Sequence, residues 1–239
     1  MTDYVNVVTM RQASTISLRR RPRVGVGSAC STAEVTLRKT LAAFAFLALG
    51  GPALAAGSGD SKLAPTGSYS LETRHSQVLF AIPHLGITDY YGRFEKVSGT
   101  LNFNPAAPEK SAVSVTIDTS SANVMSSELM GEIVGPSVFD SAKFPTATFV
   151  SKTIERTGST SGKMTGDLTI HGVTRPVTFD ITFNGGAPSP MGGAAYALGF
   201  HATAIVKRSD YGLDKMMWTS FVGDEVRLTI EAMFQQQKA

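Results

Sequence analysis

The stretch VTFDITFN, residues 177–184, carries the clearest structural signal in the chain. Its apolar side chains stand at every second position, and Thr, Asp, Thr and Asn occupy the positions between them. Because successive side chains of a β-strand point to opposite faces, this period of two predicts a strand with one apolar and one polar face. Such a strand belongs in a sheet that buries one side and leaves the other in water.

Seven further segments repeat this alternation, with turn-forming residues between them; they are 77–83, 92–103, 113–118, 147–154, 164–170, 196–206 and 226–231. Eight strands with one apolar face each must close on themselves or form a sandwich to bury that face and protect their edges. We therefore predict an all-β fold, an eight-stranded antiparallel barrel within residues 67–235.

One segment of the chain, residues 122–142, lacks the alternation. Its apolar residues come in pairs, the last of them Ile133-Val134, and Gly135-Pro136 then acts as a stop signal. We expect one or two short helices here, near one mouth of the barrel.

Residues 1–55 have the layout of a leader with a secretory signal peptide. Two basic residues precede nine apolar residues at 41–49, Gly50-Gly51-Pro52 breaks a helix, and Ala53-Leu54-Ala55 is a small-residue cleavage site. Nine residues span roughly 14 Å as a helix, about half of the ~30 Å hydrocarbon core, which favours a signal over a membrane anchor.

We expect cleavage after Ala55, a flexible lead-in at 56–66, and a periplasmic protein with no membrane span in its mature form. The long stretch before the signal also fits a translation start near Val35.

Charge is distributed unevenly between the leader and the rest of the chain. The first 55 residues hold seven Lys and Arg against two Asp and Glu, whereas the remainder holds 15 against 17. The only cysteine, Cys30, also lies in the leader. The basic character therefore belongs to the leader, and we expect no nucleic-acid partner. Without a thiol, the exported part depends on its core and backbone hydrogen bonds rather than on disulfides.

Catalytic motifs are absent from the sequence: there is no G-x-S-x-G, no H-E-x-x-H and no P-loop. The four histidines, His75, His84, His171 and His201, are separated by 9, 87 and 30 residues, which matches no compact set of metal ligands. We expect a protein that is not an enzyme, with no catalytic residue, metal or cofactor. A carboxylate pair assembled by the fold would overturn this expectation.

An eight-stranded barrel encloses just enough space for side chains or for one small ligand. The alternation points ten residues inward, and these are the candidates for a ligand-binding cavity wall: Val78, Phe80, Ile82, Leu101, Phe103, Phe149, Leu168, Phe179, Ile181 and Phe200. Two interpretations are open, an ordinary packed core and an apolar cavity for a chain-like lipid.

Short motifs follow one another in a fixed order along the mature chain. They are Tyr69 with His75-Ser76, Val78-x-Phe80, His84-x-Gly86, Gly92-x-Phe94, Phe139-Asp140, FPTATF at 144–149, GDLTIHGVTRPV at 166–177, RSDYG at 208–212 and GDEV at 223–226. Each motif alone is weak, but in this order and over residues 69–234 they resemble the YceI family, the lipocalin-like polyisoprenoid-binding proteins of bacteria.

The resemblance implies a lipocalin-like barrel whose tunnel binds a polyisoprenoid, a quinone-like tail, or a fatty-acyl or other amphiphilic lipid without catalysis. Such a protein would transport or sequester its lipid, and a homodimer is compatible with it. The alternative is a ligand-free scaffold, an interaction or stress-response module of the cell envelope.

The sequence departs from the family at one place. Members often carry Arg-Asp-x-His-Leu shortly before the Phe-Asp motif, but the aligned stretch here is LMGEI at 129–133, with neither Arg nor His. Loss of positive charge would weaken a contact with pyrophosphate more than one with a neutral quinone.

Three residues are candidates for contact with the ligand's head group at the mouth. His84 ends an apolar strand and either donates to the ligand or bonds the backbone. Arg208 either binds an anionic head group or pairs with Asp210 or Asp224. Trp218, in the stretch KMMW, suits a lipid-facing rim or a loop folded over the barrel end.

Overall fold

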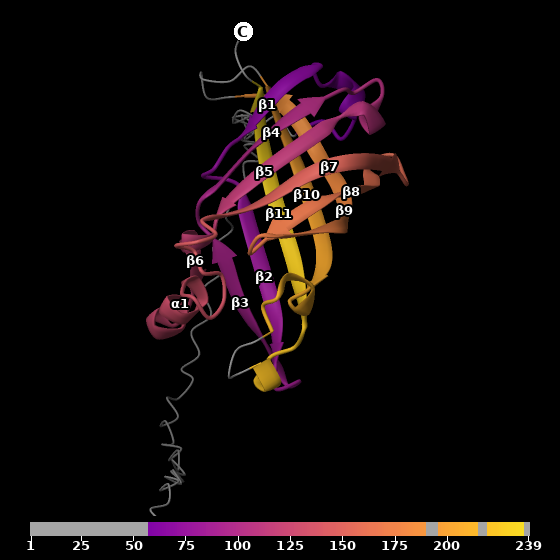
Figure 1. The fold of residues 1–239 in the computed structure, drawn as a ribbon. Helices are drawn as coiled ribbons and strands as arrows, with labels where there is room; N and C mark the ends of the chain where they lie inside the picture. The colour runs from indigo at the N-terminus through magenta and orange to yellow at the C-terminus, as the bar shows by residue number, and fades with distance from the viewer. Residues whose placement is uncertain (1–56, 190–195, 215–218, 237–239) are drawn as a thin grey trace, which may run out of the picture. The chain divides into compact units, whose positions relative to one another are not determined.

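The computed structural model describes residues 57–189, 196–214 and 219–236. The leader, with the expected signal peptide at 41–49 and cleavage site after Ala55, lies outside these residues. The described chain forms one α-helix, α1 (Ser127–Val134), and eleven strand segments (Figure 1). The strands are β1 (Gly67–Leu71), β2 (Gln77–His84), β3 (Thr88–Phe94), β4 (Val97–Phe103), β5 (Ala112–Asp118), β6 (Ala122–Val124), β7 (Thr146–Arg156), β8 (Ser161–Ile170), β9 (Val173–Pro188), β10 (Tyr196–Lys207) and β11 (Glu225–Gln236).

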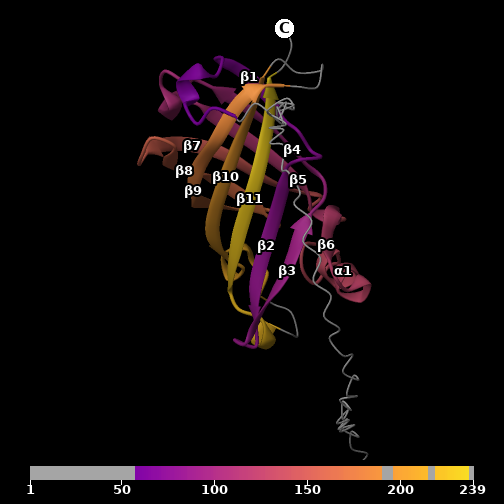
Figure 2. The ribbon, with the colours of Figure 1, turned by 180° about the vertical axis from the view of Figure 1, so that it is seen from behind.

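All hydrogen-bonded strand pairs are antiparallel, in the order β1-β4-β5-β7-β8-β9-β10-β11-β2-β3-β6, with a further pairing of β1 with β11. β1 and β2 both pair with β11 and make one interrupted wall strand. Likewise, β3 and β4 make a second interrupted wall strand, and β5 and β6 make a third (Figure 2). Together with β7 to β11 they give eight wall strands. The predicted all-β, eight-stranded antiparallel barrel is confirmed.

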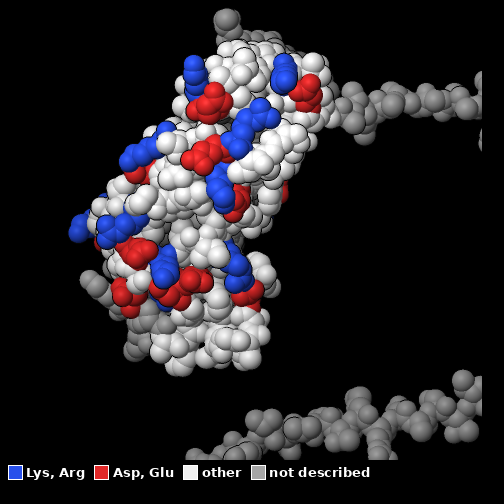
Figure 3. Space-filling model, turned by 90° about the vertical axis from the view of Figure 1, so that its right-hand side faces the viewer, with Lys and Arg blue, Asp and Glu red and all other residues white. Residues whose placement is uncertain are grey.

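The alternating apolar and polar side chains of β9 lie on the inner and outer faces of the barrel wall. Val177, Phe179 and Phe183 are buried, whereas the polar residues between them are exposed. On the outside, charged side chains of opposite sign meet across neighbouring strands, as seen along the wall in Figure 3. Lys163 Nζ lies 2.6 Å from Asp180 Oδ1, and Lys152 Nζ lies 2.7 Å from Asp167 Oδ2. The inside of the wall is therefore apolar, and the outside carries ion pairs between neighbouring strands.

The break between β1 and β2 is organised around the Glu72 carboxylate, whose side chain is 8 % exposed. It accepts hydrogen bonds from the backbone N–H groups of Arg74 and His75, from Arg74 Nε at 3.0 Å and from His75 Nδ1 at 2.6 Å. Burial acts to raise the pKa of Glu72, but these hydrogen bonds together outweigh it and lower the pKa to about 2. His75 thus has a structural partner at the strand break.

α1 lies beside β6, which ends the hydrogen-bonded sheet (Figure 1). Ser126 caps the helix by accepting from Leu129 N–H at 3.3 Å, and Gly135 follows its last turn. The expected short helix is therefore confirmed within 122–142. The expectation fails at Ala122–Val124, which is a strand because these residues pair with Gly92–Phe94 of β3. Helix α1 then covers the apolar side chains of this strand.

Two stretches differ from the sequence-based expectation outside the helix. Residues 57–66, expected as part of a flexible lead-in, contain a 3-10 helix at Ser61–Leu63, and Ser58 bridges Gly186 of β9. Ala64 is buried, and the Tyr69 hydroxyl donates to Pro65 O at 2.7 Å. The single strand expected at 92–103 is interrupted at 95–96, where Glu95 N–H donates to Ser121 O.

Candidate functional site

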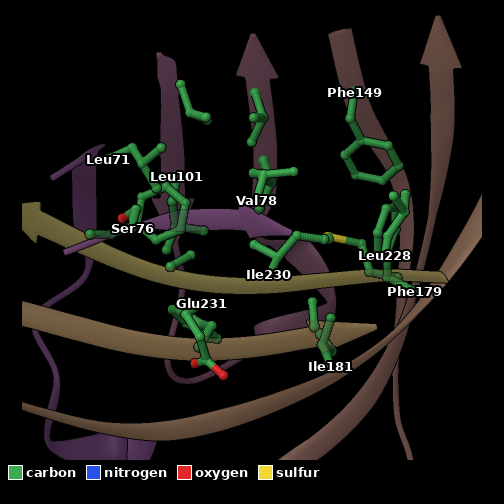
Figure 4. Close-up of a pocket in the computed structure, with 18 of the residues that line it drawn as sticks. Leu71, Ser76, Val78, Leu101, Phe149, Phe179, Ile181, Leu228, Ile230 and Glu231 are labelled. Atoms are coloured by element: carbon green, nitrogen blue, oxygen red, sulfur yellow. The ribbon is translucent and has the colours of Figure 1, made fainter. Parts of the chain in front are cut away.

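The interior of the barrel holds two apolar cavities that lie end to end. Cavity 1 has a volume of about 180 Å³ and is lined from β1, β2, β4, β5 and β7 to β11. Figure 4 shows its side chains running from Leu71 and Leu101 at one end to Phe149 and Phe179 at the other. Glu231 lies at the edge of cavity 1, and its carboxylate is hydrogen-bonded to His201, whose Nδ1 lies 2.6 Å from Glu231 Oε1. Cavity 1 thus offers a ligand almost only hydrocarbon contacts.

Cavity 2 is larger, about 350 Å³, and is lined by β2, β3, β5, β7, β8, β10, β11, α1 and the segments that follow α1 and β10. Aromatic rings line much of it: Phe80 and Phe94 lie 5.7 Å apart, and Phe94 and Phe139 lie 5.6 Å apart, between ring centroids. Phe80 lies against Gly92 of the neighbouring strand, where a Cβ would collide with the ring. Gly92 therefore lets this ring lie flat on the cavity wall.

Four residues line both cavities and so form a ring between them: Val78 of β2, Ile117 of β5, Leu168 of β8 and Leu228 of β11. All four are aliphatic. The two cavities thus adjoin each other at this aliphatic ring. Cavity 2 alone is large enough to lie within the ~300–1,000 Å³ range of small-molecule sites.

All ten residues predicted for the cavity wall line one or both of these cavities. Leu101, Phe103, Phe149, Phe179, Ile181 and Phe200 line cavity 1, Phe80 and Ile82 line cavity 2, and Val78 and Leu168 line both. Their contact with a ligand stays a prediction.

The part of the wall that α1 and its following segment supply was not predicted from the sequence. Leu129, Ile133, Val138 and Phe139 line cavity 2 where β6 has no further strand beside it. Period-two alternation cannot find them. The one available signal is the spacing of four between Leu129 and Ile133, which places both on one helix face.

His84 ends β2 and lines cavity 2. Its backbone bridges Val222, and its carbonyl accepts from Ile87 N–H at 3.1 Å. The backbone of His84 is therefore hydrogen-bonded, while the residue also borders the cavity. Its position is compatible with both interpretations made from the sequence.

Arg208 also borders cavity 2, but its guanidinium makes hydrogen bonds to backbone carbonyls of the segments that follow β10. The side chain is buried, and it donates to Leu213 O at 2.6 Å, to Gly223 O at 2.9 Å and to Val222 O at 3.2 Å. Burial lowers its pKa, and the nearby charge of Asp224 opposes that effect. Asp224, one of the two partners considered from the sequence, instead accepts from Ser209 N–H and Oγ. Contact of Arg208 with a head group stays a prediction. Trp218 lies outside the described residues.

Tyr211 is the other notable polar group at this end. Its hydroxyl is buried without a hydrogen-bond partner in the described part of the chain, and burial raises its pKa to about 12. The ring lines cavity 2, so this side chain remains a neutral phenol beside the apolar interior.

No group of three or more His, Cys, Asp or Glu among the described residues is placed to hold a metal ion. Within the same ranges, no helix combines the length and the apolar composition needed to cross a membrane.

A closed antiparallel barrel with an apolar interior and a few polar groups at one end defines a lipocalin-like β-barrel. The chain belongs to the YceI-like domain family, which matches residues 69–234.

Curated relatives agree with this assignment. UPF0312 proteins of Pseudomonas savastanoi pv. phaseolicola and of Pseudomonas putida are 38% identical over 177 residues, covering 74% of this chain and 88% of each relative.

Solved structures extend the comparison to the fold. BcnA of Burkholderia cenocepacia is 27% identical with a TM-score of 0.60, covering 68% of this chain and 98% of that one. The YCEI protein of Campylobacter jejuni is 30% identical with a TM-score of 0.58, covering 66% and 91%. A polyisoprenoid binding domain from Saccharophagus degradans, implicated in plant cell wall breakdown, shares the fold at 15% identity and a TM-score of 0.52, covering 71% and 98%.

Proposed function

We propose that this protein binds a long apolar lipid of the polyisoprenoid type in its two cavities, without catalysis, and carries or sequesters that lipid in the periplasm. The observation that carries the proposal is the apolar interior, in which two adjoining cavities of about 180 Å³ and 350 Å³ share four aliphatic side chains. A flexible hydrocarbon chain fits two such adjoining volumes better than a rigid ring system does. The ligand-free scaffold, in contrast, calls for a filled interior.

The polar groups around cavity 2 favour a neutral head group over a pyrophosphate. Arg208 uses three side-chain hydrogen bonds on backbone carbonyls, and Lys207 is the other cation among the described residues that line the cavity. Helix α1 places Glu132 at the cavity where many family members have a basic stretch. A pyrophosphate needs several charge-assisted donors, whereas a quinone carbonyl or an alcohol needs one or two. We therefore expect a prenyl quinone or prenyl alcohol.

Extraction of the purified protein with organic solvent, followed by mass spectrometry, tests the proposal. We expect a co-purifying prenyl lipid at a fixed ratio to protein, and binding of added prenyl alcohol by the extracted protein. An interior that takes up no prenyl chain after extraction would refute it.

The proposed location rests on the leader. N-terminal sequencing of protein from the periplasmic fraction should begin at Ala56. A start before Arg38 in the exported protein would contradict a cleaved signal peptide.

A further inference from the structure

One end of the barrel carries an exposed apolar surface. It is formed by the turn between β2 and β3 and by the 3-10 helix at Thr219–Phe221. Leu85, Ile87 and Phe221, here named the apolar tip, are 55%, 81% and 52% exposed. Leu85 N–H donates to Phe221 O at 2.7 Å, and His84 bridges Val222, so the two segments form one surface.

The backbone of the tip makes its apolar side chains unexpected. Leu85 has φ of 54°, in the left-handed region that suits Gly and Asn, and Gly86 follows with φ of 70°. An exposed leucine in this conformation is disfavoured by its backbone and by its contact with water. An apolar phase would remove the second disadvantage, so the exposed leucine points to a surface that such a phase covers when the protein works.

The tip is continuous with cavity 2. Phe221 is half-exposed and at the same time lines that cavity, together with His84 and Val222. A lipid chain passing over Phe221 would therefore move from the tip into the interior along apolar surface.

Charged side chains are absent from the tip. Residues 84–88 and 219–223 include no Asp, Glu, Lys or Arg, and Figure 3 shows this lower end of the barrel white below the charged rows of the wall. Behind the tip, Asp89 forms an ion pair with Arg227, and Asp224 accepts from Ser209. The tip can therefore enter an apolar phase without desolvating an unpaired charge.

We propose that the apolar tip inserts into the surface of a lipid bilayer, so that a lipid passes between bilayer and cavity 2 without crossing water. The inference rests on the proposed function for its purpose, but the docking itself is measured separately. Three apolar side chains on a turn suit the headgroup boundary, about 5–10 Å deep. Because the described residues of the tip, 84–88 and 219–223, carry no positive charge, we expect docking that does not depend on anionic lipid.

Vesicle flotation tests the docking. The purified protein is mixed with vesicles of phosphatidylcholine alone, or of phosphatidylethanolamine with phosphatidylglycerol, at low and high salt. We expect binding to both, unaffected by salt. Ile87→Asp should lower the vesicle partition coefficient at least about tenfold. Leu85→Asn, whose new side chain tolerates the left-handed backbone, should lower it as well. Ile205→Asp is the matched control, at a 59% exposed position of β10 on the outer wall.

Binding of a prenyl alcohol in vesicle-free solution should be the same in all variants, which shows that they are folded. The proposal is overturned if the parent protein does not float with vesicles while it binds the prenyl alcohol, or if it binds a protein partner through the tip instead. It is also overturned if Ile205→Asp loses as much vesicle binding as Ile87→Asp. Tip-dependent vesicle binding without any prenyl binding would support the docking and refute the proposed function.

Discussion

Leu228→Trp is the substitution that tests most directly whether the two cavities act as one path. Leu228 is half-buried on β11 and belongs to the aliphatic ring between cavities 1 and 2. Its neighbours across the two strand pairs are the small Ala204 on β10 and Phe80 on β2, and the side chain lines both cavities, so a larger side chain extends into open space. An indole here should block passage at the ring and confine a ligand to cavity 2.

The size of the effect follows from the volumes. At about 30 Å³ for each water-sized group, cavity 1 holds roughly six carbon atoms and cavity 2 roughly twelve. Six carbons at ~0.8 kcal/mol each give at most about 5 kcal/mol of binding free energy. Ordering the chain offsets part of this, which leaves about 2–3 kcal/mol, or roughly 30- to 150-fold in Kd.

The assay compares two prenyl alcohols by titration calorimetry on delipidated protein. Geraniol, with ten carbons, fits cavity 2 alone, whereas geranylgeraniol, with twenty, requires both cavities. Leu228→Trp should weaken geranylgeraniol by the stated factor and leave geraniol within about twofold, which also shows that the variant is folded. Ile205→Trp on the outer wall is the control for adding an indole. Equal losses for both alcohols, or no loss for either, would refute a two-cavity path.

Three further predictions concern stability. Gly92→Ala puts a methyl group against the Phe80 ring and should lower the free energy of unfolding by about 1–3 kcal/mol in a urea titration, and an unchanged midpoint would mean that the ring moves freely. Arg208→Lys keeps the charge but cannot reach the carbonyls of Leu213, Val222 and Gly223 together, so thermal unfolding should report a loss of about 2–3 kcal/mol; a loss below about 0.5 kcal/mol would contradict its structural role. The pKa of Glu72 is lowered from 4.5 to about 2, so its contribution is complete above about pH 4.5 and is lost as the pH falls toward about 2. Glu72→Gln, followed by denaturant unfolding across this range, should cost about 1–2 kcal/mol near pH 7, after allowance for solvent screening of its exposed partners, and nothing near pH 2; a pH-independent cost would contradict the lowered pKa.

The inward-facing residues were predictable because one local rule governs them. Once 177–184 is a strand, its side chains must alternate between the two faces, and a slip of one residue would expose every apolar group. Phe179 and Ile181 therefore line cavity 1 as the sequence predicted. β1 and the start of β3 escaped prediction because GSYSL and TDYYG carry too few apolar residues to show the alternation.

The polar groups were less predictable because their partners are distant in sequence. The sequence left Arg208 with two interpretations, a contact with an anionic head group or a pair with Asp210 or Asp224, yet its guanidinium donates to carbonyls as far away as Gly223. Which acceptor a buried guanidinium finds depends on how a loop folds back over the barrel end, and no periodicity in the sequence encodes that. The Glu72 cluster, in contrast, lies within four residues, but it matters only because β1 and β2 break there beside β11.

The sequence by itself determined the strand faces, the apolar character of the interior and the family, since these follow from residues that are neighbours or alternate along the chain. Only the tertiary structure decided that the interior is two cavities with a ring of Val78, Ile117, Leu168 and Leu228 between them. It also decided that Leu85 and Phe221, 136 positions apart in the chain, share one exposed tip. The physical reason is that a cavity or a surface patch is made by closure of the barrel. Closure brings together side chains whose separation along the chain carries no information about their separation in space.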